Sequence, residues 1–315
     1  MRTALALGAA SCIGGAFAQA NSPTTIVLAF PPGGATDTLA RMLAEQLQAR
    51  LGTPVIVEYR PGGNHEIANQ YVNSQPANGK TLYLISTPFV ATAASNPTVH
   101  KYHPARDFTP LARLTTNVAV LVASTSFPPN NVPELVAYAK ANAGKVQFAT
   151  TGIGSQDHLL AYRIGKLSGT EFNIVHYKGA GQALQDLMGG HVDLKTDSYA
   201  SAKPGLDSGR LKLLAVADAA PSRLLPGQKT INDTIPGASL SSFFGVAAPR
   251  GMAPDVAARL STVLQEVIRS EELAPKLKLL AMEPAPLGPA EFGKFMSDSY
   301  SSVQAIVKEA GIKME

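Results

Sequence analysis

Two short segments of this chain place glycine, hydroxyl and carboxylate residues directly after an apolar run of strand length. The run 25–30 leads into Pro-Pro-Gly-Gly-Ala-Thr-Asp at 31–37, and the run 146–150 leads into Thr-Gly-Ile-Gly-Ser-Gln-Asp at 151–157. Glycine lets the backbone turn sharply, and the first amides of a following helix have no partner inside that helix. Such helix starts attract anions. The repeated pattern predicts two turns that hold one small carboxylate from both sides.

The candidate ligand-binding residues lie in these turns and at the ends of neighbouring strands. In the first half of the chain they are Phe30, Pro32, Gly33, Gly34, Ala35, Thr36, Asp37, Ser86 and Thr87. In the second half they are Thr150, Thr151, Gly152, Gly154, Ser155, His158 and Asp197. The glycines contact the ligand or only shape a turn. Asp37 either complements the helix dipole or holds a ligand amine or water. Asp197 either contacts the ligand or its water, or caps a turn. His158 is either packed in the first turn of its helix or in contact with the ligand.

The sequence offers little that could catalyse a reaction. The turn 152–157 lacks the third glycine of a dinucleotide fingerprint, and the chain has no Gly-x-Ser-x-Gly elbow and no Walker loop. The histidines show no metal-ligand spacing. We therefore expect no cofactor, no metal and no enzymatic activity. An exported enzyme that acts on small carboxylates is the less favoured alternative.

Length and composition fit two α/β domains with ordinary cores. The chain has 315 residues, of which 45% are hydrophobic and 16% are charged. The net charge of +4 comes from scattered lysines and arginines without a basic block. This distribution argues against nucleic acid as a partner, although a mildly basic surface helps an anionic ligand to approach.

Residues 1–20 have the features of a cleavable signal peptide. Arg2 precedes the apolar stretch 4–17, and Ala18-Gln-Ala20 fits an A-x-A cleavage site. The single cysteine, Cys12, lies inside this segment. Lipidation of Cys12 is the alternative to cleavage after residue 20. No later apolar run approaches the roughly 18 residues that cross a bilayer, so we expect a periplasmic protein without disulfides.

The elements that must position the two turns repeat a strand–helix order. We expect strands at 25–30, 54–59, 80–86, 145–150, 171–177, 191–197 and 211–217. We expect helices at 36–51, 64–74, 155–168, 180–189, 255–269 and 289–309. Right-handed crossovers make such strands parallel, and ligands then bind beyond their carboxyl ends.

The order of these elements divides the chain into two lobes. Two apolar segments, 118–123 and 243–249, are long enough to cross from one lobe to the other as a hinge. Both helices near the carboxyl terminus are expected to cover the first lobe. The predicted division is domain 1 at 21–123 and 245–315, and domain 2 at 124–244.

Seven motifs in order resemble the Bug (TctC-like) substrate-binding proteins of tripartite tricarboxylate transport systems. They lie at 30–41, 51–62, 102–110, 134–144, 152–158, 176–179 and 187–190. The resemblance implies an α/β, two-lobed periplasmic binding protein fold of type II. Each lobe would be a mainly parallel sheet flanked by helices, with two crossover strands as hinge. It further implies a small organic carboxylate held largely by backbone amides and waters.

The resemblance also implies how the protein works in the cell. A monomer would deliver its ligand to the integral membrane permease subunits of a tripartite tricarboxylate transporter. Signalling by the liganded protein to a membrane sensor is the alternative. The sequence leaves the ligand open among di- and tricarboxylates, amino acids and aromatic acids, and it leaves open whether the lobes stand apart or closed.

One loop departs from the family's pattern. Where the family has small residues after Arg-Pro-Gly, this chain has Gly63-Asn-His-Glu66. His65 and Glu66 either contact the ligand, which would make affinity depend on pH, or are solvated residues at a helix start.

Overall fold

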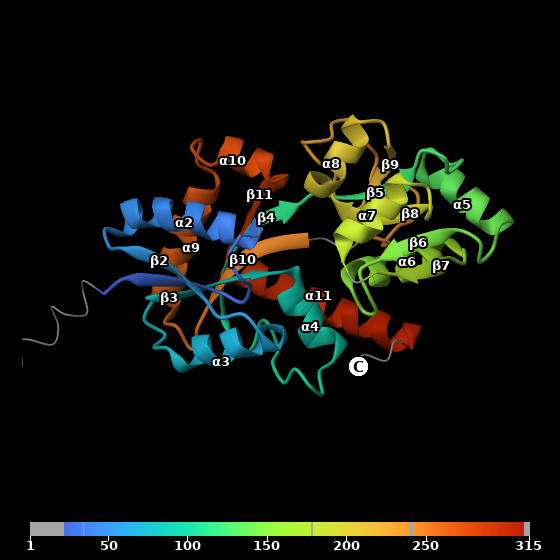
Figure 1. Cartoon of the computed structure of the whole chain (residues 1–315). Helices are drawn as coiled ribbons and strands as arrows, with labels where there is room; N and C mark the ends of the chain where they lie inside the picture. Colours follow the sequence, from blue (N-terminus) through green and yellow to red (C-terminus); the bar gives the residue numbers. More distant parts are fainter. Residues whose placement is uncertain (1–21, 34, 178, 240–241, 312–315) are drawn as a thin grey trace, which may run out of the picture.

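The protein folds into two lobes, each built on one β-sheet (Figure 1). The computed structural model describes residues 22–33, 35–177, 179–239 and 242–311. The predicted signal peptide at 1–20, with Cys12, and the candidate residue Gly34 lie outside the described residues.

The first lobe contains a six-stranded sheet in the order β11-β4-β10-β3-β1-β2. The strands are β1 (Thr24–Leu28), β2 (Val55–Tyr59), β3 (Thr81–Ser86), β4 (Thr109–Asn117), β10 (Ser242–Ala248) and β11 (Met282–Leu287). The helices of this lobe are α2 (Ala35–Leu51), η1 (Gly63–His65), α3 (Glu66–Ser74), α4 (Thr87–Ser95), α9 (Pro254–Ile268) and α10 (Ala274–Leu279). Strand β1 is parallel to β2 and β3, whereas β10 is antiparallel to β3 and β4.

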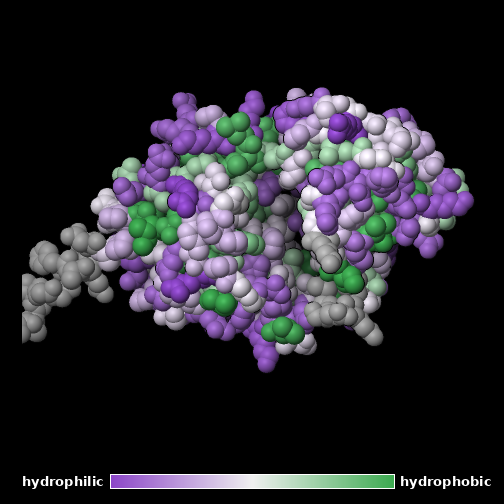
Figure 2. All heavy atoms as spheres, viewed as in Figure 1, coloured by the Kyte–Doolittle hydropathy of each residue, from purple (hydrophilic) through white to green (hydrophobic). Residues whose placement is uncertain are grey.

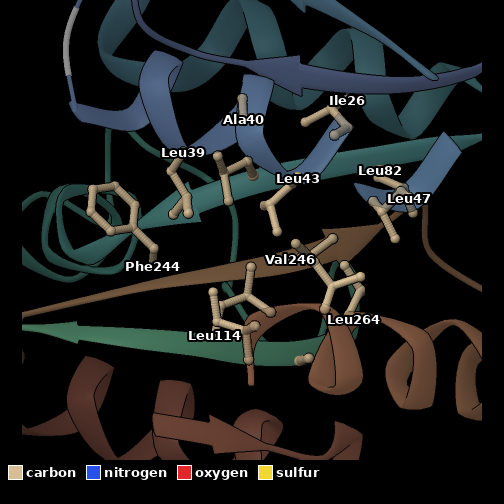
Figure 3. Packing of buried hydrophobic residues seen from close by; sticks show 14 of the residues in the cluster. Ile26, Leu39, Ala40, Leu43, Leu47, Leu82, Leu114, Phe244, Val246 and Leu264 are labelled. Carbon is tan, nitrogen blue, oxygen red and sulfur yellow. The ribbon is translucent and has the colours of Figure 1, made fainter. Parts of the chain in front are cut away.

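Helix α2 shows why this lobe folds as the sequence predicts. Its leucines recur every four residues, and Leu39, Leu43 and Leu47 are all buried. They point toward sheet residues that include Ile26 on β1 and Val246 on β10 (Figure 3). The helical period therefore places one apolar stripe on the sheet, and this stripe fixes α2 with its first turn at the carboxyl end of β1.

The second lobe contains a five-stranded sheet in the order β7-β6-β8-β5-β9. The strands are β5 (Ala119–Ser124), β6 (Gln147–Thr150), β7 (Asn173–His176), β8 (Leu194–Ser198) and β9 (Leu211–Val216). The helices are α5 (Val132–Ala141), α6 (Gln156–Ser168), α7 (Ala180–Met188), α8 (Tyr199–Asp207) and η2 (Ile231–Asp233). Strand β6 is parallel to β7 and β8, and β5 is antiparallel to β8 and β9. Both sheets are thus mixed, with the parallel pairs confined to the strand–helix–strand units.

The chain changes sheets at a single residue between β4 and β5. The Val118 N–H donates to Ala281 O of the first lobe at 3.1 Å, while Val118 O accepts from Tyr199 N of the second lobe at 2.8 Å. Strand β5 then pairs entirely within the second sheet. This differs from the expected hinge strand at 118–123, because the crossing needs one residue and not a strand. The second expected hinge strand, 243–249, also does not cross, because β10 pairs from Ser242 onward only with β3 and β4 of the first sheet.

The last helix, α11 (Pro289–Ala310), spans both lobes (Figure 1). Its first half buries Phe292 and Met296 in the first lobe. Its second half packs Val303 and Ile306 against Leu159 of α6. The expectation that this helix covers only the first lobe was wrong for its second half, because 22 residues of helix extend about 33 Å.

Candidate ligand-binding cleft

The first predicted turn is closed by its own aspartate. The Asp37 side chain accepts the Gly33 N–H at 2.8 Å and the Tyr59 hydroxyl at 2.7 Å. Asp37 is only 7% exposed, and Arg41 Nε lies 2.9 Å from its carboxylate. The hydroxyl and the amide hold the pKa of Asp37 below its usual range. The Gly33 amide, expected to face a ligand, is therefore used inside the turn, and Asp37 stays ionised as part of it.

The second turn repeats this arrangement. The Thr151 N–H donates to Asp157 Oδ2 at 2.8 Å, and the Gly154 N–H donates to His158 Nδ1 at 3.0 Å. Ser155 caps α6 by accepting the His158 N–H at 3.3 Å. Within the described part of the chain, the amides of Gly152 and Ile153 donate no hydrogen bond. Two backbone donors of this turn therefore remain for a ligand.

Several cavities lie between the lobes, where Figure 2 shows the surface hollowed, and two of them contain residues of the predicted second turn together with polar residues of the first lobe. The mouth cavity has a volume of about 450 Å³ and is lined from both lobes. Its residues include Asn64, Thr87, Ser95 and His100 of the first lobe and Thr151, Ile153, Gly154 and Ser155 of the second. The floor cavity, of about 250 Å³, lies at the chain crossing and is lined by residues that include Asn117, Thr151, Asp157, Lys195, Asp197 and Ser242. The volume of the mouth cavity lies within the range of small-molecule sites, and the volume of the floor cavity lies just below it.

The structure brings together part of the predicted set. Thr87, Thr151, Gly154 and Ser155 line the mouth, and Thr151 and Asp197 line the floor. Phe30, Pro32, Gly33, Ala35, Thr36, Asp37, Ser86, Thr150, Gly152 and His158 line neither cavity.

Three of these residues are engaged elsewhere in the protein. Ser86 is buried at the end of β3. The Thr150 hydroxyl bonds to His176 Nδ1 at 2.6 Å, and the His158 ring packs edge-on against the ring of His176. Burial, with His176 beside it, lowers the pKa of His158. His158 therefore fits the packed alternative.

Lys195 is a floor residue that the sequence analysis missed. It is 2% exposed, and its Nζ donates to Thr196 O at 2.7 Å. The same Nζ lies 3.3 Å from Asp197 Oδ2 and 3.7 Å from Asp157 Oδ2. The available signal was the spacing of Lys195 and Asp197, because residues two apart in a strand share one face. The site therefore contains one buried cation between two carboxylates.

Asp218, which follows β9, is hydrogen-bonded to the segment where the chain first crosses between the lobes. Its Oδ2 accepts the Ala119 N–H at 2.9 Å, next to the first crossing. Burial raises the pKa of Asp218 to about 7, although backbone hydrogen bonds from Ala119 and Ser242 act in the opposite direction. The sequence analysis did not single out this residue.

In the loop that departs from the family's pattern, Glu66 fits the helix-start alternative, whereas His65 fits neither expectation. His65 is 8% exposed and packs edge-on against Phe30, with ring centroids 5.2 Å apart, and against Phe89. Neither ring nitrogen of His65 has a hydrogen-bond partner among the described residues. His65 is thus a core residue of the first lobe, while Glu66 begins α3.

No helix in the described ranges is long and apolar enough to span a bilayer. Nor do three His, Cys, Asp or Glu side chains come together as a metal site in that part of the chain.

Two α/β lobes joined at a narrow crossing, with cavities between them that both lobes line, define a periplasmic binding protein. The chain belongs to the tripartite tricarboxylate transporter receptor family, TctC, whose family model matches residues 39–312. This membership confirms the resemblance drawn from the motifs. The family is one of substrate-binding receptors and not of enzymes.

Individual relatives agree over nearly the whole chain. Protein BugT of Bordetella pertussis is 30% identical over 296 residues, covering 93% of this chain and 90% of that protein. A TctC solute binding protein from Polaromonas, solved without ligand, superposes with a TM-score of 0.83 at 26% identity, covering 91% of this chain and 98% of its own. R. palustris Rpa4515 with adipate superposes with a TM-score of 0.73 at 30% identity, covering 92% and 97%. These matches confirm the two-lobed fold.

Proposed function

We propose that this protein captures a small organic carboxylate between its lobes and delivers it to the membrane subunits of a tripartite tricarboxylate transporter. The observation that carries the proposal is the mouth cavity, to which both lobes contribute polar residues at the ends of their strands. Adipate in a relative that is 30% identical supports a carboxylate as the class of ligand.

The free amides of the second turn give this proposal a physical basis. A carboxylate loses its hydration when the lobes close on it, which costs several kcal/mol. Hydrogen bonds to a charged group return about 1.5–3 kcal/mol each. Gly152 and Ile153 provide two backbone donors, and the amides at the starts of nearby helices add others. Three or four such bonds offset this cost, and we expect an affinity of roughly micromolar order, about −8 kcal/mol.

The proposal includes the predicted export, the monomeric state and two domains. We move the division between domains from the predicted 123/124 and 244/245 to Val118 and to a point between Val216 and Ser242, since β5 pairs in the second sheet and β10 in the first. The intact mass of the protein isolated from the periplasm should correspond to a chain that begins near Asn21. Light scattering should give the mass of a monomer. A diacylglycerol-modified species beginning at Cys12 would contradict export by cleavage after residue 20.

Calorimetric titration of the mature protein tests the binding step. The panel pairs each carboxylate with its uncharged amide, for example succinate with succinamide and adipate with adipamide. We expect at least one carboxylate to bind near micromolar affinity and its amide to bind much more weakly. If no compound of the panel binds, or if each acid and its amide bind with equal affinity, the proposed class of ligand is wrong.

Uptake measurements test the delivery step. Cells that lack the permease subunits should lose uptake of the bound carboxylate while the purified protein still binds it. Normal uptake in such cells, together with a transcriptional response that depends on the binding protein, would instead favour the signalling alternative.

A further inference from the structure

Strand β8 carries a lysine in the interior of the second lobe. Lys195 is 2% exposed, and its place in the sheet is opposite Ala149 on β6. A buried ammonium group is costly unless partners compensate its charge. Its Nζ donates to Thr196 O at 2.7 Å and lies 3.3 Å from Asp197 Oδ2 and 3.7 Å from Asp157 Oδ2. Of these three partners only Asp157 belongs to another element, so Lys195 links β8 to the start of α6.

The Asp157 carboxylate gathers the hydrogen-bond donors of the second turn. It accepts the Thr151 N–H at 2.8 Å, the Thr151 hydroxyl at 3.0 Å and the His158 N–H at 3.1 Å, and it also accepts the Ser155 hydroxyl. Gly152, between these donors, has a φ of +129°. Glycine has little conformational preference of its own. The path of the turn is therefore set by the bonds to Asp157.

The ion pair of the second turn differs from that of the first in its exposure. In the first turn, Asp37 pairs with Arg41, whose side chain is 61% exposed, so water and salt screen the attraction. In the second turn, the side chains of Lys195 and Asp157 are only 2% and 10% exposed. Opposite charges attract more strongly where water is excluded. Lys195 therefore holds the Asp157 carboxylate, whose Oδ2 also accepts the Thr151 N–H, more firmly than Arg41 holds Asp37.

We propose that Lys195 is a positioning residue for ligand binding. Through Asp157 it holds the second turn in the conformation that presents the Gly152 and Ile153 amides to the ligand carboxylate. This inference rests on the proposed function, because it assigns Lys195 a role in the same site. Lys195 acts through Asp157 and makes no bond to the ligand, since its ammonium is engaged by oxygens of the protein.

Two variants test the inference by calorimetry with the carboxylate that binds the parent protein most tightly. Lys195→Met should lower the affinity about tenfold or more, which corresponds to one lost bond to a charged group. This change leaves two buried carboxylates without a cation. Lys195→Met combined with Asp197→Asn keeps the parent's excess of one negative charge, and it should lose the same affinity relative to Asp197→Asn alone. Lys203→Met is the control, because Lys203 is exposed on α8 and pairs only with Asp207 among the described salt bridges.

A double-mutant cycle separates positioning from direct contact. In the Asp157→Asn background, Lys195→Met should lower the affinity by less than about twofold, because the lysine then has no charged anchor of the turn to hold. An equal loss in both backgrounds shows that the Lys195 ammonium binds the ligand itself, and this result overturns the inference.

Nuclear magnetic resonance of protein with isotope-labelled glycine and isoleucine gives a readout that a general loss of stability does not move. In the ligand-free charge-matched variant, the amide signals of Gly152 and Ile153 should shift or broaden, whereas the signal of Gly33 in the first turn should stay in place. Unchanged affinity or unchanged signals of Gly152 and Ile153 overturn the inference and leave the proposed function intact. Binding of no carboxylate by the parent protein overturns both.

Discussion

The Thr151 N–H donates to Asp157 Oδ2 at 2.8 Å, and this same oxygen lies 3.7 Å from Lys195 Nζ. Asp157 thus joins the second turn, which lines the mouth of the cleft, to the buried cation of its floor. The first lobe has the corresponding bond from Gly33 N to Asp37, but there the cation is the exposed Arg41. The second turn is therefore the one tied to the floor of the cleft.

Replacing Asp157 should loosen this connection. Asp157→Asn keeps the shape of the side chain but removes its charge, so the bonds from Thr151 weaken and Lys195 loses one carboxylate. We expect the free energy of unfolding to fall by about 1–3 kcal/mol. Urea denaturation measures the change. Asp207→Asn, on an exposed pair, should change it by less than about 0.5 kcal/mol, and equal effects of the two variants would contradict a structural role for Asp157.

Gly152 tests whether the second turn faces the ligand. Its φ is +129° and no atom lies within 4 Å of the position of an added Cβ, so Gly152→Val strains the backbone without a clash. Gly251→Val is the matched control, with φ of +85° and equally open space. We expect both variants to lose some stability. Only Gly152→Val should lose affinity, by about tenfold, for the carboxylate that binds the parent protein most tightly. If the two variants bind this carboxylate with equal affinity, the turn is not part of the site.

Asp218 should make stability depend on pH. Its pKa is about 7 in the folded protein against an ordinary value of 3.8. The folded protein then binds more protons than the unfolded chain between about pH 4 and 7, so the free energy of unfolding falls as pH rises through this range. Asp218→Asn should flatten that dependence and make the protein relatively more stable at pH 8. Thermal melts across the pH range provide the measurement; parallel curves for variant and parent would refute the assignment.

His65 should change the pH dependence of stability in the direction opposite to Asp218. Burial lowers its pKa below the ordinary value of 6.5, so the folded protein binds fewer protons than the unfolded chain as pH falls through 6.5. Its contribution to stability is present above that pH and is lost below it. The His65→Phe variant should therefore be more stable than the parent at pH 5, and the difference in stability between variant and parent should be smaller at pH 8. His191→Phe, on an exposed histidine, serves as control and should show no such gain in the same melts.

Local patterns in the sequence determined the order of elements and the family. The four-residue spacing of Leu39, Leu43 and Leu47 predicted α2, because a helical stripe is a property of neighbouring residues. The glycine turns after β1 and β6 were found for the same reason, and their amides pointed to an anion. The sequence analysis missed helices α4, α5, α8 and α10 and strands β4 and β11. Tertiary pairing and packing support α4, β4 and β11 more than any local period does.

The tertiary structure alone decided which groups are free and which are used. The amides of Gly33 and Thr151 donate to Asp37 and Asp157. These hydrogen bonds depend on side-chain positions that the spacing of residues in the sequence does not specify. Lys195 meets Asp157 only because β8 lies beside β6 in the sheet. The sequence by itself thus determined the lobes and the turns. The charges of the floor were decided by contacts between residues far apart in the chain, because the energy of a buried polar group depends on the partners that the fold brings to it.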